Sequence, residues 1–192
     1  MLKKIVMGAV LFSLVLAVVA CAGPTSTPAS NPAPTQTPSP TPAATQEPAP
    51  TLNPKPKPSG PIKATWIEPK IIDGDTVSIP LSEVENNWDI HFAVGSPGGD
   101  MNFMAYILDE EIYVRANVCP PCRSIGFSLE KDILICDRCA TTFKAKTGDG
   151  IVGACVDFPK ASVPYEITDG NIVLRGNDLL AAYQDTVEPG WP

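Results

Sequence analysis

The chain has 192 residues, including 22 prolines, six cysteines and one histidine, and its formal net charge is −7. Nucleic-acid binding depends on clustered basic side chains, so an acidic chain is a poor partner for phosphate, and we expect no nucleic-acid partner. A single histidine also excludes the zinc hydrolases that coordinate their metal through two or three histidines.

The N-terminal stretch has the features of an export signal. Lys3 and Lys4 precede a nearly continuous apolar run over residues 5–20, which is shorter than the roughly 20 residues that cross a bilayer comfortably. The run ends immediately before Cys21 and resembles the lipobox of bacterial lipoproteins, in which this cysteine receives diacylglycerol. We therefore expect residues 1–20 to be a signal peptide and a lipid on Cys21 to hold the protein on the extracytoplasmic face of the cell membrane. An uncleaved transmembrane anchor is the alternative.

A proline-rich segment follows over residues 21–61. Thirteen of the 22 prolines lie in it, it has no aromatic residue, and most of its other residues are Thr, Ala, Ser, Gln and Asn. Such a composition cannot bury enough apolar surface to offset the entropy of ordering the chain. The sequence therefore predicts a disordered tether, biased towards extended polyproline II, between the lipid anchor and a folded domain.

From residue 62 onward the sequence changes to short alternating apolar runs, which are typical of strands. A possible capping box of Ser82 and Glu85 predicts one helical turn, and Asn177 is placed to cap a short C-terminal helix. Many short strands without a long helical period predict an all-β sandwich or small barrel over residues 62–192. Strands are expected at residues 76–80, 90–94, 103–108, 112–118, 129, 133–135, 163–167 and 172–174. Three hairpins are expected among them: 103–108 with 112–118, 129 with 133–135, and 163–167 with 172–174.

Two cysteine pairs carry the strongest chemical signal in this domain. Cys119 and Cys122 are separated by two prolines, and Cys136 and Cys139 follow after thirteen intervening residues. Two Cys-x-x-Cys knuckles at hairpin separation are typical of a four-thiolate metal site. Two alternatives remain open: a pair of structural disulfides, and a catalytic dithiol at Cys119 and Cys122 that would make the protein a thiol–disulfide oxidoreductase.

Four thiolates around a dication or a [2Fe–2S] core of charge +2 carry a net charge of −2, which nearby cations would offset. The basic residues close in sequence are Arg115, Arg123, Lys131, Arg138, Lys144 and Lys146.

The remaining candidates are weaker. Cys155 follows a glycine-containing approach and is interpreted as a cover over the site or an additional ligand. His91 lies on an expected strand far from the cysteines, so it is interpreted as structural. The three tryptophans are interpreted as packing residues.

With these residues in place, the stretch from Thr76 to Ile172 resembles the membrane iron-sulfur-containing FtrD-like family. The features that match are the strand at 77–80, the strand at 112–118 leading into the first cysteine pair, the second pair with Phe143, and the Gly153-x-Cys155 element. The resemblance implies an extracytoplasmic iron–sulfur domain that transfers electrons or supports iron transport, with a membrane redox or transport protein as its partner. It implies a binding or electron-transfer protein more than an enzyme.

The stretch from Cys136 to Leu174 also resembles the second half of a Rieske domain, which implies a small Rieske-like fold. Cys122 and Cys139 occupy the histidine positions of the Rieske ligand set, so an iron site here would have a lower potential. A protein that is exported folded, with its cluster already inserted, normally carries a twin-arginine signal, and this sequence has none. Zinc or a single iron ion bound after export therefore remains an alternative. A zinc- or disulfide-stapled interaction domain is the corresponding alternative function.

Overall fold

The computed structural model describes residues 51–188. The expected signal peptide (1–20), Cys21, the tether as far as residue 50, and Trp191 lie outside the described residues. No helix within the described part is both long and apolar enough to cross a membrane.

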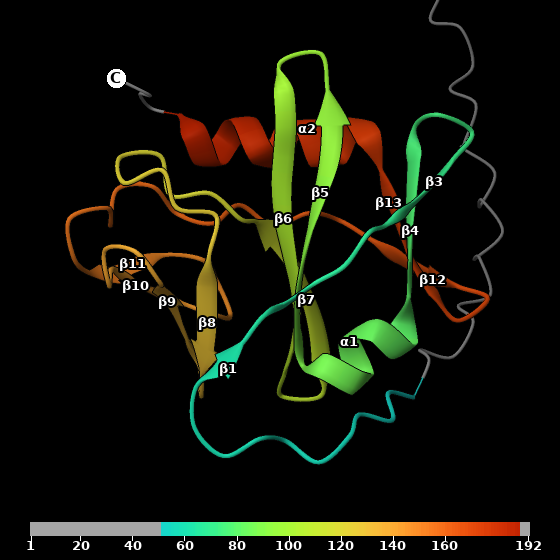
Figure 1. The fold of residues 1–192 in the computed structure, drawn as a ribbon, viewed down its shortest axis with the longest axis horizontal. Helices are drawn as coiled ribbons and strands as arrows, with labels where there is room; N and C mark the ends of the chain where they lie inside the picture. Colours follow the sequence, from blue (N-terminus) through green and yellow to red (C-terminus); the bar gives the residue numbers. More distant parts are fainter. Residues whose placement is uncertain (1–50, 189–192) are drawn as a thin grey trace, which may run out of the picture. The chain divides into compact units, whose positions relative to one another are not determined.

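Thirteen strands and two short helices make up the described residues (Figure 1). The strands form three sheets, named here the central, outer and cysteine sheets. Across the central sheet the strands are β2 (Thr65–Trp66), β5 (Asp89–Ser96), β6 (Gly99–Leu108) and β7 (Glu111–Ala116). Across the outer sheet they are β12 (Glu166–Thr168), β13 (Asn171–Arg175), β4 (Thr76–Pro80) and β3 (Lys70–Ile72). Across the cysteine sheet they are β1 (Ile62–Lys63), β8 (Phe127–Glu130), β9 (Ile133–Cys136), β10 (Thr142–Lys144) and β11 (Gly150–Val152). The helices are α1 (Leu81–Asn87) and α2 (Gly176–Val187). The predicted all-β class is confirmed.

The central sheet is buried on both faces, which explains the continuous apolar run along β6. Successive side chains of a strand point to opposite faces of the sheet. Phe103 and Ile107 belong to a first core, whereas Met104, Tyr106 and Leu108 belong to a second core. A strand that packs on both sides needs apolar residues at every position, so strict alternation between apolar and polar residues is lost.

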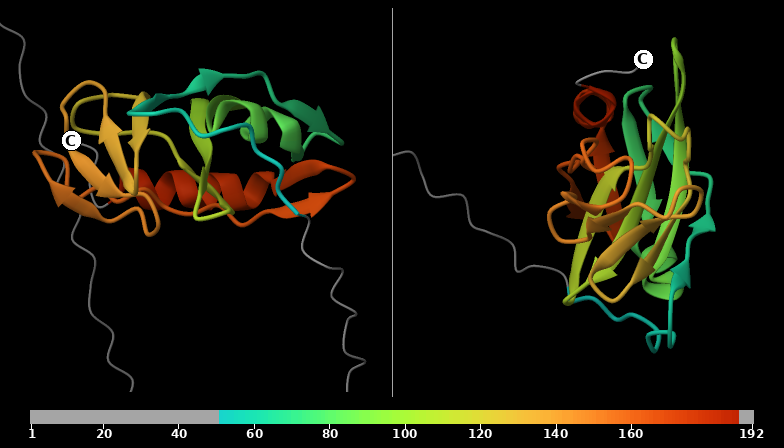
Figure 2. Two further views of the ribbon diagram at one scale, coloured as in Figure 1. Left: turned by 90° about the horizontal axis from the view of Figure 1, so that it is seen from below. Right: turned by 90° about the vertical axis from the view of Figure 1, so that its left-hand side faces the viewer.

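The first core fills the space between the central sheet, the outer sheet and the helices. Ile79 of β4 and Ile172 of β13 are register partners, and both are fully buried in it. Val84 of α1 and Leu179 of α2 close it, and α2 lies alongside β6, β7 and β13 (Figure 2). The second core lies between the other face of the central sheet and the cysteine sheet, so it supports the cysteines directly.

Most expected elements are present, but the predicted helix caps are wrong. The expected hairpins correspond to β6–β7, β8–β9 and β12–β13, all antiparallel. Helix α1 begins at Leu81 after Pro80 and has no side-chain cap, so Ser82 lies inside its first turn. The Glu85 carboxylate accepts a hydrogen bond from the amide of Asn53 instead. Helix α2 likewise begins one residue before Asn177 and has no side-chain cap.

Residues 51–61, which the sequence assigns to the tether, lie against the domain. The amide of Lys55 donates to the carbonyl of Glu85 at 3.0 Å, and the Trp88 indole donates to the carbonyl of Lys55 at 2.8 Å. Leu52 packs against the first core. The proline-rich segment therefore has a stretch at its C-terminal end that is fixed by backbone hydrogen bonds to α1 and the residue after it.

Candidate metal centre

The first cysteine pair lies in a tight turn that follows β7. The amide of Cys119 donates to the carbonyl of Ser124 at 2.8 Å, and the amide of Arg123 donates to the carbonyl of Pro120 at 3.2 Å. Arg123 has a φ of 56°, a left-handed conformation that reverses the chain. These contacts fold residues 119–124 into a knuckle that presents both thiols on one side.

The second pair lies in an equivalent turn between β9 and β10. Cys136 ends β9, and its carbonyl accepts the amide of Ala140 at 2.9 Å, while its own amide donates to the carbonyl of Thr141 at 2.9 Å. Ala140 has a φ of 55°. Each knuckle is thus closed by backbone hydrogen bonds and by one residue in the left-handed region.

The β8–β9 hairpin brings the two knuckles together. Phe127 and Cys136 are register partners, and the amide of Asp137 donates to the carbonyl of Gly126 at 3.0 Å, which joins the end of the first loop to the second knuckle. As a result, all four thiol sulfurs lie within 4.8 Å of one another. The residues that form this group are Cys119, Cys122, Cys136 and Cys139.

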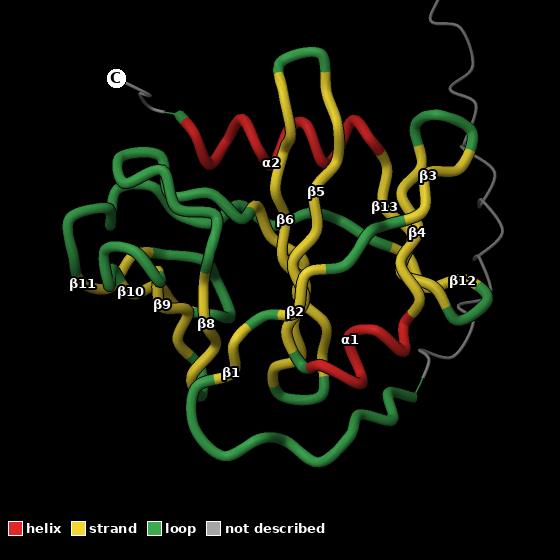
Figure 3. The backbone as a smooth tube through the Cα atoms, viewed as in Figure 1, coloured by secondary structure: helices red, strands yellow, loops and turns green. Residues whose placement is uncertain are grey.

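The four cysteines differ in exposure. Cys119 and Cys136 are completely buried in the second core, whereas Cys122 and Cys139 are half-buried. The loops around them join the short strands of the cysteine sheet (Figure 3). The site therefore has a protein-facing side and a side close to solvent.

The five cysteines of the described part are all free thiols. The Sγ atoms of Cys122 and Cys136 are 3.6 Å apart, whereas a disulfide requires about 2 Å. The Cys119–Cys122 pair precedes a turn and β8, without the strand-to-helix junction of thioredoxin-type dithiols. Neither the disulfide alternative nor the oxidoreductase alternative is supported by this geometry.

The sulfur atoms influence one another's protonation. The pKa of Cys136 is lowered to about 4, chiefly because the Cys119 thiol donates a hydrogen bond to its thiolate. The pKa of Cys119 is raised because its thiol donates this hydrogen bond to Cys136 and because it is buried. Burial also raises the pKa of Cys122 to about 11. The geometry therefore stabilises a thiolate within the group, and thiolates are the form that binds soft metals.

Cys155 lies beside the group without belonging to it. Its Sγ is 3.7 Å from that of Cys139, and its side chain is 2% exposed. The hydroxyl of Thr141 accepts the Cys155 amide at 3.2 Å and lies 3.2 Å from the Cys139 sulfur, so one side chain contacts both residues. This placement fits the interpretation of Cys155 as a cover over the site.

A buried cation on which the cysteines act was not identified from the sequence. Lys160 is fully buried, and the cysteines, Cys119 foremost, are the negative groups that act on its ammonium. Burial lowers its pKa to about 8. Among the basic residues expected to offset the charge, Arg115 is buried but contacts backbone carbonyls and Tyr106, and the other five belong to exposed positions. Lys160 lies in a loop after Pro159, where no periodic pattern indicates burial.

His91 takes no part in the cysteine group. It is 1% exposed on β5, its ring contacts the edge of Trp66, and burial lowers its pKa to about 3, so the imidazole is neutral at ordinary pH. Its Nε2 is 3.8 Å from a carboxylate oxygen of Asp89, which is too long for a hydrogen bond. The placement agrees with a structural role.

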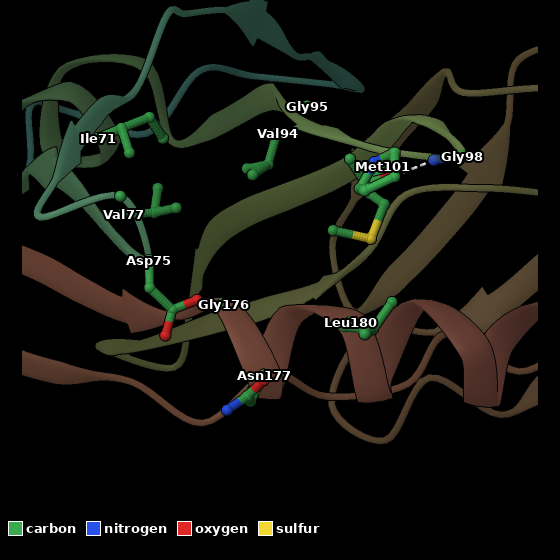
Figure 4. Close-up of a pocket in the computed structure, with 13 residues that line it drawn as sticks. Ile71, Asp75, Val77, Val94, Gly95, Gly98, Met101, Gly176, Asn177 and Leu180 are labelled. Carbon is green, nitrogen blue, oxygen red and sulfur yellow. Dashed lines mark hydrogen bonds between the residues drawn. The ribbon is translucent and has the colours of Figure 1, made fainter.

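A separate cavity of about 560 Å³ lies beside the first core, where α2 begins (Figure 4). Ile71, Val77, Met101 and Leu180 provide its apolar lining, and Asp75 stands at its edge. None of its lining residues is a cysteine, and it borders the outer sheet and not the cysteine sheet. Within residues 51–188, the four-cysteine group therefore lies apart from this cavity.

The family model "Membrane iron-sulfur containing protein FtrD-like" matches residues 84–185, more than half of the chain, and the chain belongs to this family. No curated protein matches the chain in sequence. Solved structures that are similar to it include two ferredoxin-containing ones. A chain from the "Complex of reduced oxygenase and oxidized ferredoxin in carbazole 1,9a- dioxygenase" is 16% identical with a TM-score of 0.42, and the match covers 52% of this chain and 93% of that one. The Sphingomonas yanoikuyae B1 ferredoxin is 20% identical with a TM-score of 0.41, and the match covers 50% and 92%.

The residues present fit an iron–sulfur group. Sulfur-only donor sets select zinc or iron–sulfur centres, and the family is one of iron–sulfur proteins. Two thiolates bound at about 2.3 Å to the same tetrahedral metal ion lie roughly 3.8 Å apart, and the Sγ atoms of Cys122 and Cys136 are 3.6 Å apart. The cofactor of this domain is therefore an iron–sulfur cluster.

Proposed function

The protein is a member of this iron–sulfur family, and we propose that it transfers single electrons at a membrane through a cluster held by the four grouped cysteines. The electrons pass to or from a partner in the membrane that is either a redox protein or an iron transporter. The observation that carries this proposal is the arrangement of exposure within the group: one pair of thiols is buried in the second core and the other pair is half-buried. A partner can then approach the cluster closely while the protein shields its inner side.

The roles of the surrounding residues follow from their positions. When bound, the cluster supplies the one-electron chemistry. Cys119 and Cys136 would hold it against the second core, and Cys122 and Cys139 would lie on the side that a partner can approach. The two knuckles are closed by backbone hydrogen bonds, so the ligand sulfurs are held with little freedom to rearrange when the charge changes.

Purified protein provides the first test. We expect full-length protein purified anaerobically from native membranes to contain iron and acid-labile sulfide, to absorb visible light, and to undergo a reversible one-electron reduction. The reduced form should then be oxidised on mixing with membranes from the same cells. Zinc in place of iron, or a reduced form that membranes leave unchanged, would contradict the proposal.

Anchoring by lipid is the second part of the proposal, supported by the family's description as membrane proteins and by the apolar run that ends before Cys21. We expect Cys21→Ser to appear in the soluble fraction or as an unprocessed precursor, because the acceptor thiol is lost. Membrane fractionation and mass spectrometry measure both outcomes, with Cys155→Ala as a control that removes a thiol elsewhere. A Cys21→Ser protein that stayed lipid-labelled would disprove the anchor.

A further inference from the structure

Lys160 is a buried cation without a carboxylate partner. It is 0% exposed, and none of the ion pairs within residues 51–188 includes it. Its ammonium donates to the carbonyl of Val118 at 2.8 Å and to that of Phe158 at 2.6 Å. A buried charge that only neutral groups surround is strongly destabilising, so an anion is expected close by.

Two aromatic rings further define the position of this ammonium. Its Nζ lies 4.4 Å from the ring centre of Phe143 and 5.4 Å from that of Phe127, and the two rings meet edge to face. Phe127 is the register partner of Cys136, and Phe143 belongs to β10, which follows the second knuckle. The neighbouring strands β8, β9 and β10, which position the sulfurs, thus also position the two rings beside the cation.

The backbone at Lys160 is also held firmly. Its amide donates to the carbonyl of Gly148 at 2.9 Å, and its carbonyl accepts Arg115 Nη1 at 2.8 Å. Gly148 has a φ of +84°, and a Cβ there would lie only 2.1 Å from the Lys160 carbonyl oxygen, so this close approach requires glycine. The backbone that carries this cation is therefore fixed by hydrogen bonds on both sides of the residue and by a close contact with Gly148.

The cysteines supply the negative charge that acts on this cation, whose ammonium donates to the carbonyl of the residue preceding Cys119. The neighbour of its first acceptor, Val118, is Cys119, and the negative groups acting on Lys160 are Cys119, Cys136, Cys155 and Cys122. Four thiolates around a [2Fe–2S] core of charge +2 carry a net charge of −2, and the added electron makes it −3. A fixed positive charge in a poorly screened interior stabilises the reduced state more than the oxidised one.

We infer that Lys160 is a positioning residue of the iron–sulfur site whose buried ammonium raises the reduction potential of the cluster. This inference rests on the proposed function for the identity of the ligands, but it concerns the isolated protein and does not depend on any partner. It also assigns a role to the only lysine in the described part that is fully buried.

Two neutral replacements separate charge from hydrogen bonding. Lys160→Met removes both the charge and the donors, whereas Lys160→Gln removes the charge and keeps a donor for a carbonyl. The matched control is Lys144→Gln, which removes an exposed charge from β10 next to Phe143. The measurement is a redox titration of each anaerobically purified full-length protein, with iron per chain determined in parallel.

We expect both Lys160 variants to bind iron and to be reduced at lower potential, with about a tenfold smaller ratio of reduced to oxidised cluster at a given solution potential, or roughly 60 mV. Lys144→Gln should leave the potential nearly unchanged because solvent screens its charge. Unchanged potentials in iron-loaded Lys160 variants, or a shift in Lys160→Met alone, would overturn the inference. A shift with no electron exchange at membranes would refute the proposed function and leave the inference standing, and a wild-type protein without a reversible step would overturn both.

Discussion

Cys136→Ser is expected to lose at least nine-tenths of its bound metal and to unfold much more easily than the wild type. Cys136 is 1% exposed and lies in the second core as well as in the cysteine group. A serine hydroxyl is a poor ligand for a soft metal, and the binding free energy of such a site is coupled to folding. Iron per chain after anaerobic purification, together with unfolding in urea, measures both effects.

The matched control for this change is Cys155→Ala. Both residues are buried cysteines of the second core, and their sulfurs lie in the same part of the domain. Because the four grouped cysteines already supply four thiolates, Cys155→Ala should keep the metal at full stoichiometry and change only its exposure to chelators or oxidants. Equal metal loss in the two variants would contradict the covering role and place Cys155 in the ligand set.

The cysteine site illustrates what sequence reasoning can reach. The knuckles are local structures, set by spacing and by a hairpin of a few residues, so Cys119, Cys122, Cys136 and Cys139 could be grouped before any coordinates were known. The same holds for the strands of the β6–β7 hairpin, whose turn and apolar residues are adjacent in the chain. Features formed by residues close together in the chain can therefore be predicted from the sequence alone.

Lys160 and Arg115 show where such reasoning fails. Arg115 alternates with the apolar residues of β7, a pattern typical of a solvent-facing position, but that side of the central sheet is covered by the second core. The burial of both cations depends on contacts more than forty residues apart in the chain, such as that between Lys160 and Val118. No periodicity within one strand can indicate a second layer of sheet packed on its polar face.

Arg115 connects the central sheet to the loops beneath the cysteine site. It is 3% exposed, and its guanidinium donates to the carbonyls of Ala145, Lys146 and Lys160 and to the hydroxyl of Tyr106, at 2.6 to 3.2 Å. These partners come from the loop between β10 and β11, from the loop after β11, and from β6. One side chain thus satisfies carbonyls that no regular strand pairing reaches.

We expect Arg115→Leu to lower the free energy of unfolding by about 3 kcal/mol or more, because buried carbonyls are left without donors. Arg115→Lys should recover only part of this loss, since one ammonium cannot reproduce the planar fork of donors. Urea unfolding of each full-length protein is the measurement. Arg175→Gln is the matched control: this arginine pairs with Glu166 at 3.2 Å on the surface of the outer sheet, and exposed pairs contribute less than about 1 kcal/mol.

The position of Arg115 links this loss of stability to the metal site. Its contact with the Lys160 carbonyl helps to hold the loop that places the buried ammonium, so Arg115→Leu should also release metal to a chelator faster than Arg175→Gln does. If the two variants unfolded at the same urea concentration, the buried hydrogen bonds of Arg115 would contribute no more than a surface pair. Arg115 would then fill space between the sheets without joining them, and the cysteine sheet would depend on the second core alone.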